Sequence, residues 1–182
     1  LSIDTYHSQV AKESVTAGGH LINDISGGEM DKEMIPTIGQ LQVPYIFMHM
    51  KGTPETMQDK TQYEDVTLEV LDYFIHKVKE CKQAGIKDLI IDPGFGFAKN
   101  IQQNLLLLKN LSSFKILDKP ILVGVSRKST IYKTLGNTAE EALNGTTVLN
   151  TIALQNGANI LRVHDVKEAR EAITLFQTYG KA

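Results

Sequence analysis

The stretch LIIDPGFGF (89–97) decides the fold of this chain, because three apolar residues run directly into an aspartate and the strand then stops. Pro93 and Gly94 end the strand immediately after Asp92. Five other apolar runs lead into charged or amide residues in the same way: LSIDTYH (1–7), LINDISGG (21–28), PYIFMHMKG (44–52), ILVGVSRKS (121–129) and ILRVHDV (160–166). A buried parallel strand is apolar throughout, so packing does not explain polar groups at one end of many strands. An α/β barrel explains them, since its catalytic residues come from the carboxyl ends of several strands.

The composition is that of a globular domain. The chain has 182 residues, of which 42% are hydrophobic and 22% charged, enough for one domain with a real core. The formal net charge of -2 argues against a general electrostatic grip on nucleic acid or on an anionic membrane surface. No apolar run approaches the roughly 20 residues of a membrane span, and there is no signal-peptide pattern. We therefore expect neither nucleic acid nor a membrane as a partner.

Cysteine usage favours a reducing compartment. Cys81 is the only cysteine, so an internal disulfide is impossible, which fits a cytoplasmic protein. Between Glu80 and Lys82 this residue is interpreted as an ordinary helix position and not as a thiol nucleophile.

Strands and helices alternate along the whole chain. Strands are predicted near 1–4, 21–25, 44–50, 89–92, 121–126 and 160–164. Helices are predicted near 7–17, 31–41, 64–84, 101–112, 139–156 and 166–178, with a short one over 130–135. Gly18, Gly85 and Gly157 follow helical patterns, where a helix C-terminus favours glycine. Asp31 and Asp165 stand where N-caps are favoured. No composition shift interrupts the pattern, so we expect a single domain over 1–182.

This alternation implies a parallel sheet with right-handed crossovers. Six units alone could form an open doubly wound sheet, whereas eight units close a barrel. A barrel typically needs about 250 residues, and adding two units of roughly 30 residues to this chain gives about 240. The chain also opens inside a strand-like run at Leu1. We therefore predict a (β/α)8 TIM barrel of which this chain carries six βα units, strands 3 to 8.

Two polar residues share one face of the last predicted strand. Arg162 and His164 alternate with Val163, so both can reach one anion at the barrel mouth. Arginine offers a planar fork for phosphate oxygens, and histidine adds a hydrogen bond. The alternative is a surface ion pair with Asp165 or Glu168. Two polar groups on one face of an apolar strand favour the anion site.

Asp92 presents two acceptor oxygens and no donor when ionised. It suits a ligand edge with two parallel N–H groups, such as an arginine or a 2-amino-4-oxopyrimidine. The alternative, an Asx cap on the turn that follows, is equally compatible with the sequence.

Other strand ends carry less specific signals. Asn23 and Asp24 are adjacent, so only one of them faces the barrel interior in a regular strand. Asn23 would suit a heterocycle with mixed donor and acceptor edges. Asp4, which shares a face with Ser2, is compatible with a turn residue.

The segment SRKS (126–129) places two cations beside two hydroxyls at a strand end and before a short helix. A solvated basic turn is the alternative, but anions are favoured at helix N-termini. Lys128, if it points inward, brings a compact charge with three donors. If Met48 and Met50 line the interior, His49 faces the helices and is a structural residue.

Taken together, six motifs in this order resemble the dihydropteroate synthase family: SIDT, NDISGG, MHMKGTPETMQ, DPGFGFAK, GVSRKS and RVHDV. The resemblance covers nearly the whole chain. SRKS and RVHD together distinguish this family from the methyltetrahydrofolate-binding methyltransferases, which share the pterin-binding barrel.

The resemblance implies a reaction and a set of ligands. The family is a transferase of folate biosynthesis that joins 6-hydroxymethyl-7,8-dihydropterin diphosphate to p-aminobenzoate, with Mg²⁺ as cofactor, and it is the target of sulfonamides. The residues implied for the pterin are Asp4, Asn23, Met48, Asp92 and Lys128. Arg162 and His164 are implied for the diphosphate, and Phe97 and Ser129 for p-aminobenzoate.

The implied chemistry is an ionising substitution. Diphosphate departs first and leaves a pterin methylene cation, which the amine then attacks. Arg162, His164 and Mg²⁺ would stabilise the leaving group, whereas Asp4 and Asp92 would stabilise the cation. The expected catalytic set is Lys128, Arg162, His164 and Asp4, and no nucleophilic side chain is required.

The chain departs from the family pattern at its front, where the first two strands and their loops are not found. We expect the metal ligand in that segment and none in this chain. The 182 residues alone are therefore expected to be weakly active or inactive, and a homodimer is implied by the family. A non-catalytic pterin-binding fragment, a methyltransferase domain of the related group and a phosphate-binding barrel isomerase are the alternatives.

Overall fold

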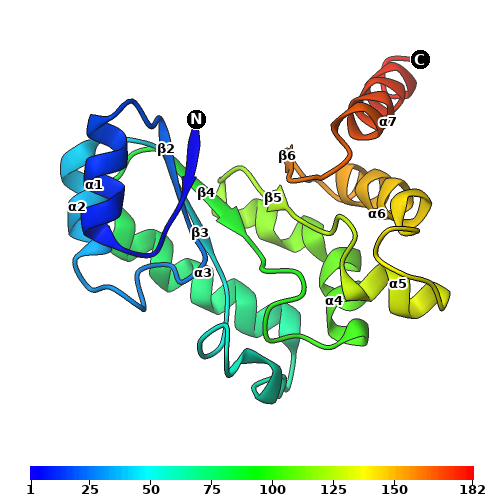
Figure 1. Ribbon diagram of the computed structural model, residues 1–182, viewed down its shortest axis with the longest axis horizontal. Helices are drawn as coiled ribbons and strands as arrows, with labels where there is room; N and C mark the ends of the chain where they lie inside the picture. The colour runs from blue at the N-terminus through cyan, green and yellow to red at the C-terminus, as the bar shows by residue number, and fades with distance from the viewer.

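Six short parallel strands, each followed by a helix, form the computed structural model (Figure 1). It describes the backbone of residues 1–182 and every side chain except that of Gln58. The strands are β1 (Ser2–Asp4), β2 (Leu21–Asp24), β3 (Tyr45–Met48), β4 (Leu89–Asp92), β5 (Leu122–Val123) and β6 (Ile160–Leu161). The helices are α1 (Ser8–Thr16), α2 (Met34–Leu41), α3 (Val66–Gln83), α4 (Ile101–Lys109), α5 (Ser129–Leu135), α6 (Leu143–Gln155) and α7 (Val166–Tyr179), with 3-10 turns η1 (Met57–Asp59) and η2 (Leu111–Leu117).

The strands lie in the order of the sequence. β1, β2, β3 and β4 pair in parallel, and so do β5 and β6. A parallel bridge between Ile91 and Ile121 connects the two groups, and the Ile91 N–H donates to the Pro120 carbonyl at 3.0 Å. A doubly wound sheet reverses its strand order at a switch point, so this sequential order selects the barrel alternative.

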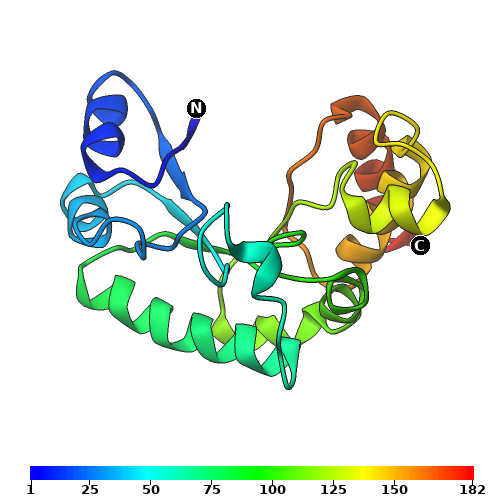
Figure 2. The same cartoon turned by 60° about the horizontal axis from the view of Figure 1, so that its bottom comes forward.

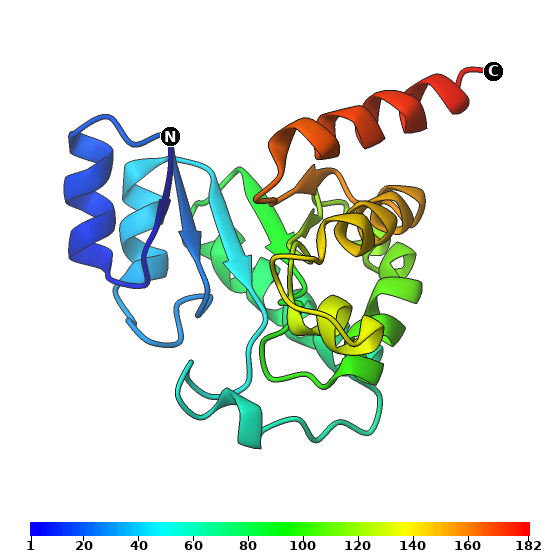
Figure 3. The same ribbon diagram turned by 45° about the vertical axis from the view of Figure 1, so that its right-hand side comes forward.

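The helices cover the outside of this curved sheet. Figure 3 shows α1 and α2 beside the strands of the N-terminal half, and Figure 2 shows the N-terminal and C-terminal units at opposite ends of the arc. Among the described residues, β1 and β6 are the edge strands of a partial barrel. The predicted fold class and all six strand positions are confirmed, although β5 and β6 are shorter than predicted. The pairing of β5 with β6 ends at Val123 and Leu161, so Gly124 and Arg162 lie just outside these strands.

The outward side chains of the strands build the core with α3. Tyr45, Phe47 and Phe74 are all fully buried. The Phe74 ring packs edge to face on Phe47 at 5.6 Å and on Phe114 at 5.9 Å between centroids, a geometry that aromatic pairs prefer. Cys81 is fully buried on the same helix, and burial raises the pKa of its thiol to about 12, which fits the prediction of a structural residue.

The predicted helix stops are confirmed, whereas one predicted cap is wrong. Gly18, Gly85 and Gly157 follow helices with positive φ angles of 103°, 85° and 104°. Asp31 does not cap α2, which begins at Met34. Its carboxylate accepts from the N–H of Ser8 at 2.7 Å, at the start of α1, and from the N–H of Glu33 at 3.0 Å, and Glu33 is the N-cap residue of α2.

His49 occupies the helix layer, as the parity of β3 predicts. Only 4% of the residue is exposed, and its ring lies 5.0 Å from the ring of Tyr73 between centroids. The ammonium group of Lys99 lies 3.0 Å from Nδ1 of His49. Burial, with the charges of Lys99 and Lys51, lowers the pKa of His49 to about 2. The folded protein therefore holds this imidazole neutral.

This neutral histidine predicts a pH-dependent loss of stability. The unfolded chain binds a proton below the ordinary histidine pKa of 6.5, whereas the folded protein does not until about 2. The unfolded state therefore binds more protons in this window, and the free energy of unfolding falls as the pH decreases through it. Compared with His49→Gln, which removes the titration, the wild-type chain should lose about 1.4 kcal/mol per pH unit below about pH 6.

Urea unfolding of both chains at several pH values measures this difference. Parallel pH profiles for the wild-type and His49→Gln chains would show that His49 titrates alike in the folded and unfolded states.

Candidate active site

The carboxyl ends of the first two strands and the segment after the last one meet at Asp4. The Asn23 side-chain amide donates to Oδ1 of Asp4 at 2.7 Å, and Nη2 of Arg162 donates to Oδ2 at 2.6 Å. Arg162 therefore pairs with Asp4 across the mouth, which excludes the alternative pairing with Asp165 or Glu168. Asp24 faces the opposite way and is fully buried against the helices, where it accepts from the Tyr45 hydroxyl at 2.7 Å.

A cavity of about 410 Å³ opens beneath these three side chains, inside the barrel. Its size lies within the range of small-molecule sites. The cavity is lined by Asp4, Asn23 and Arg162 together with Ser2, Leu21, Ile46, Leu122, Ile160 and Leu161. Apolar walls with a few convergent polar groups at the rim are typical of a ligand pocket.

Asp92 is buried at the end of β4, where it is 8% exposed and pairs in register with Met48. Its Oδ1 accepts from the Gly94 N–H at 2.8 Å, so the Asx turn foreseen as an alternative does form. Oδ2 makes no hydrogen bond with the described residues and is available to a ligand. Burial raises the pKa of Asp92, and the opposing influences are led by the charge of Lys128.

Lys128 reaches the same region from the N-cap position of α5. Its Nζ donates to the Phe95 carbonyl and lies 4.9 Å from the centroid of the Phe97 ring, a cation–π contact. Burial lowers the pKa of this ammonium group, whereas Asp92 opposes that change. Asp92, Lys128 and Phe97 thus form one cluster.

Two glycines lie close to Lys128. A side chain at Gly96, whose φ is +81°, would meet Cδ of Lys128 at 3.2 Å. A Cβ at Gly124 would lie 3.8 Å from Cβ of Arg162 and 3.9 Å from Nζ of Lys128. Lys128 and Arg162 therefore flank Gly124, which connects the Asp92 cluster to the Asp4 cluster.

His164 is held at the mouth by a serine that sequence reasoning did not single out. Oγ of Ser126 lies 2.9 Å from Nδ1 of His164 and accepts from the His164 backbone N–H at 3.2 Å. The serine hydrogen is then free to donate to Nδ1, a pairing that leaves the Nε2–H facing away from the serine. Ser129, the other hydroxyl of this segment, begins α5 and is partly buried.

Arg127 is a second residue that sequence reasoning missed. It adopts a positive φ of 52° and makes a two-pronged ion pair with Asp165, at 2.9 and 2.8 Å. Its remaining nitrogen donates to the carbonyls of Ala139 and Glu140. The arginine holds the pKa of Asp165 below its ordinary value. Asp165 stands at the N-cap position of α7, but its side chain makes no cap hydrogen bond.

The pair connects the segment after β5 to the start of α7 and thereby positions Lys128 and His164. In the sequence, the two members of the Arg127–Asp165 pair are the first cation of SRKS and the aspartate of RVHD.

Lys99 is the third missed residue, and its signal was the final lysine of DPGFGFAK. Only 3% of this residue is exposed. Three backbone carbonyls and His49 surround its ammonium group.

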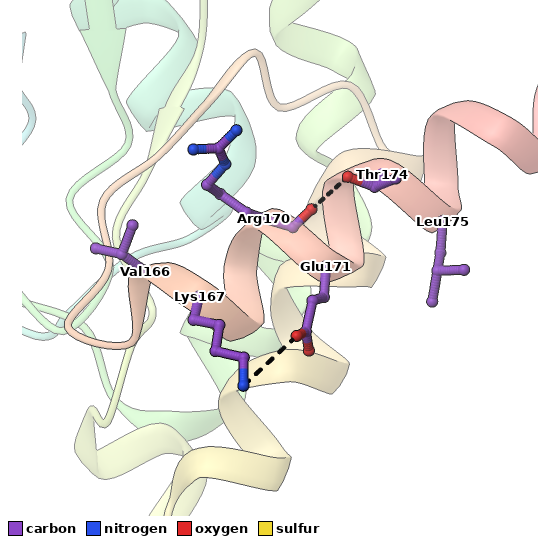
Figure 4. A pocket seen from close by; sticks show the side chains of 6 residues that line it. All are labelled: Val166, Lys167, Arg170, Glu171, Thr174 and Leu175. Atoms are coloured by element: carbon purple, nitrogen blue, oxygen red, sulfur yellow. Dashed lines mark hydrogen bonds and ion pairs between the residues drawn. The ribbon is translucent and has the colours of Figure 1, made fainter.

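A larger surface hollow of about 830 Å³ lies along α7, the helix that follows the RVHD segment (Figure 4). Its lining comes from α7 alone: Val166, Lys167, Arg170, Glu171, Thr174 and Leu175. The hollow contains no residue of the mouth. We therefore assign the candidate site to the mouth and not to this flank.

The described side chains do not form a metal site. Within the described part of the chain there is no cluster of three or more His, Cys, Asp or Glu residues suited to a metal ion. The cations at the mouth, Lys128 and Arg162, do not suit a Mg²⁺ ion, which prefers oxygen ligands. No described residue is therefore assigned to a metal.

None of the described helices is long and apolar enough to cross a bilayer.

Comparisons with known proteins agree with this geometry. The model of the pterin binding enzyme family matches residues 1–164. Dihydropteroate synthase from Escherichia coli K12 is 42% identical over 179 residues, which cover 97% of this chain and 63% of that protein. The chain thus spans less than two thirds of the length of that relative.

Solved structures give the same result. Yersinia pestis dihydropteroate synthase, in a complex with a sulfonamide drug, is similar with a TM-score of 0.96 and 38% identity over 100% of this chain and 66% of that one. The Thermus thermophilus enzyme, in complex with 4-aminobenzoate, has a TM-score of 0.93 and 35% identity over 97% of this chain and 69% of that one. The chain belongs to the pterin binding enzyme family and, within it, to the dihydropteroate synthases.

Proposed function

We propose that this protein acts as a dihydropteroate synthase, which condenses 6-hydroxymethyl-7,8-dihydropterin diphosphate with p-aminobenzoate and releases diphosphate. The observation that carries the proposal is the buried Asp92 carboxylate, which has one unpaired oxygen and lies beside Lys128 at the carboxyl end of a barrel strand. A carboxylate in this setting selects a ligand edge rich in N–H donors.

The pterin is proposed to bind with its 2-amino and N3 hydrogens on Asp92. Met48, which is 3% exposed, would pack on the ring, and Asn23 and Asp4 would bond the other edge. Lys128 would lie between the pterin and the second substrate. These roles rest on a shared strand parity that brings all four strand-end side chains toward the barrel interior.

The diphosphate is proposed to bind Arg162 and His164. The side chain of Arg162 is 62% exposed and pairs only with Asp4 among the described residues, so its fork can turn to an anion. p-Aminobenzoate would lie near the Phe97 ring and Ser129, since Ser129 begins α5. Complexes of the Thermus thermophilus relative with 4-aminobenzoate and of the Yersinia pestis relative with a sulfonamide drug support these ligand classes.

The reaction is proposed to proceed by departure of diphosphate before attack by the amine. Arg162 stabilises the negative charge that develops on the leaving group. When the leaving group draws Arg162 away, Asp4 loses its ion-pair partner but keeps the Asn23 hydrogen bond, and its charge can stabilise the pterin methylene cation. Asp92 contributes a second negative charge on the pterin side. No nucleophilic side chain is needed.

A cofactor, an oligomeric state and a location are also proposed for this protein. Mg²⁺ is proposed as the cofactor from the family resemblance, with ligands outside the described side chains, and no step above depends on it. A homodimer and sulfonamide binding are proposed from the same resemblance. A cytoplasmic location is proposed because the single cysteine, Cys81, is free and buried.

We also propose that the 182 residues alone are weakly active or inactive, because both sides of the Asp4–Arg162 pair remain more than half exposed. Dihydropteroate formation should be measured on this chain, on the same chain extended at its amino end with the corresponding segment of the Escherichia coli relative, and on that relative. We expect strong turnover from the last two only. Pterin binding without turnover in all forms of this chain would support a binding protein, and robust turnover by the 182 residues would contradict the dependence on further segments.

Asp92→Asn tests the pterin contact. The asparagine oxygen can still accept from Gly94, but the other position then presents donors where the pterin also presents donors. We expect the affinity for 6-hydroxymethylpterin to fall by about 1–3 kcal/mol through lost charge-assisted bonding. Isothermal titration measures it, with Asp88→Asn, an exposed aspartate just before the same strand, as the matched control. Unchanged binding by a folded Asp92→Asn chain would remove Asp92 from the site.

Arg162→Ala separates the diphosphate contact from the pterin contact. Loss of a charge-assisted fork should weaken 6-hydroxymethylpterin diphosphate by about 1.5–3 kcal/mol while affecting the bare pterin much less. Competition binding of the two ligands measures the difference. Arg170→Ala, an exposed arginine on α7, is the control. Equal losses for both ligands would contradict the assignment.

A further inference from the structure

The ammonium group of Lys99 lies inside the loop that follows β4. Its Nζ lies 3.1 Å from the Gly94 carbonyl, 3.0 Å from the Phe97 carbonyl and 3.0 Å from Nδ1 of His49, with the His49 carbonyl at 3.4 Å. Its three hydrogens therefore all have acceptors, which a buried ammonium group requires. The contacts connect both ends of the 94–97 turn to the end of β3.

This turn carries the groups that shape the candidate pterin site. Asp92 accepts from the Gly94 N–H at one end, and the Phe95 carbonyl accepts from Lys128 in the middle. The Phe97 ring, at the other end, lies under the Lys128 ammonium group. Moving the carbonyls that Lys99 holds would therefore displace both Asp92 and Lys128.

The start of α4 braces the same turn. The Asn104 side-chain oxygen accepts from the Gly96 N–H at 2.8 Å, and its amide donates to the Lys99 carbonyl at 3.1 Å. Asn104 of α4 thus fixes the backbone of Lys99, while the Lys99 side chain connects the turn to the end of β3. The loop has a defined shape because both contacts exist together.

Lys99 also contributes charge. Burial raises the pKa of Asp92, and the influences that oppose this rise are Lys128, the Gly94 N–H, Lys99 and Arg162. Burial in turn lowers the pKa of Lys99 to about 7, with Asp92 opposing and with Lys128 and Lys51 adding to the decrease. His49 is neutral and supplies a lone pair. The charged groups that act on Lys99 are therefore Asp92 at the end of β4, Lys128 at the start of α5 and Lys51 in the segment after β3.

We propose that Lys99 is a positioning residue of the pterin site, which holds the carbonyls of the 94–97 turn and helps to keep Asp92 ionised. The identity of the ligand rests on the proposed function, whereas the action on Asp92 does not. Lys99 is 3% exposed and separated from the ligand by the turn, so it acts through Asp92, Phe97 and Lys128 and not by contact.

The first experiment measures Asp92 without any ligand. Carboxyl carbon NMR should follow the titration of Asp92, whose pKa is raised by burial, in the wild-type chain, Lys99→Met and Lys99→Gln. Both variants remove a positive charge, so the midpoint of Asp92 should rise in both relative to wild type. Lys109→Met, an exposed lysine at the end of α4, is the matched control and should leave the midpoint in place. An unchanged midpoint in folded Lys99 variants would overturn the proposal.

The second experiment adds 6-hydroxymethylpterin. Lys99→Met should weaken binding about tenfold near pH 5, by a factor that shrinks toward pH 8, because Lys99 itself loses its proton there. A structural defect alone would weaken binding equally at each pH, and that result would overturn the charge role. The wild-type chain could bind no pterin while the titration midpoint of Asp92 still rises in the Lys99 variants. In that case the proposed function fails and the inference about Lys99 stands.

A third measurement needs no variant and covers the case in which the Lys99 variants do not fold. The Nζ resonance of Lys99 should titrate near pH 7 in the wild-type chain, and the amide resonances of Gly96 and Phe97 should shift with the same midpoint. Amides of the turn that do not follow the Lys99 titration would overturn the proposal.

Discussion

A carboxylate buried at the end of a barrel strand depends on positive charge around it, and the arrangement of this site follows from that dependence at Asp92. Removing a carboxylate from water is costly unless partners compensate for it. Here the compensation comes from Lys128, from the Gly94 N–H and from the charges of Lys99 and Arg162. The compensating groups come from loops after three different strands, so the fold of all three is coupled to one side chain.

Strand parity separates the two kinds of polar residue in this chain. Asp4, Asn23, Met48 and Asp92 occupy positions that alternate with core residues, and Asp4, Asn23 and Arg162 line the interior cavity. Asp24 and His49 fall on the opposite parity and are buried among the helices with hydrogen-bond partners. A one-residue change of register would exchange these roles, because the side-chain period of a strand is two. The apolar core and α3 prevent such a change.

The mouth also joins distant parts of the chain. The Asp4–Arg162 pair spans nearly the whole sequence and connects the two edge strands of the partial barrel. Arg127 and Asp165 make a comparable connection between the segment after β5 and α7. Both pairs use arginine, and the planar fork of Arg127 makes a two-pronged contact, whereas Arg162 makes a single bond to Asp4. The guanidinium group also suits the diphosphate proposed for Arg162. Arg162 would therefore both bind the ligand and connect the two edge strands through Asp4.

The sequence by itself determined the order and type of the elements, the parity of the strand ends and the family, because hydrophobic period and strand-end motifs are local properties of the chain. The site roles of Asp4, Asn23, Asp92, Lys128, Arg162 and His164 stay predictions. Only the tertiary structure decided which charges meet: Asp4 with Arg162, Arg127 with Asp165, and Lys99 with His49. These pairings join residues that lie far apart in the sequence, and local pattern carries no information about a distance that packing alone sets.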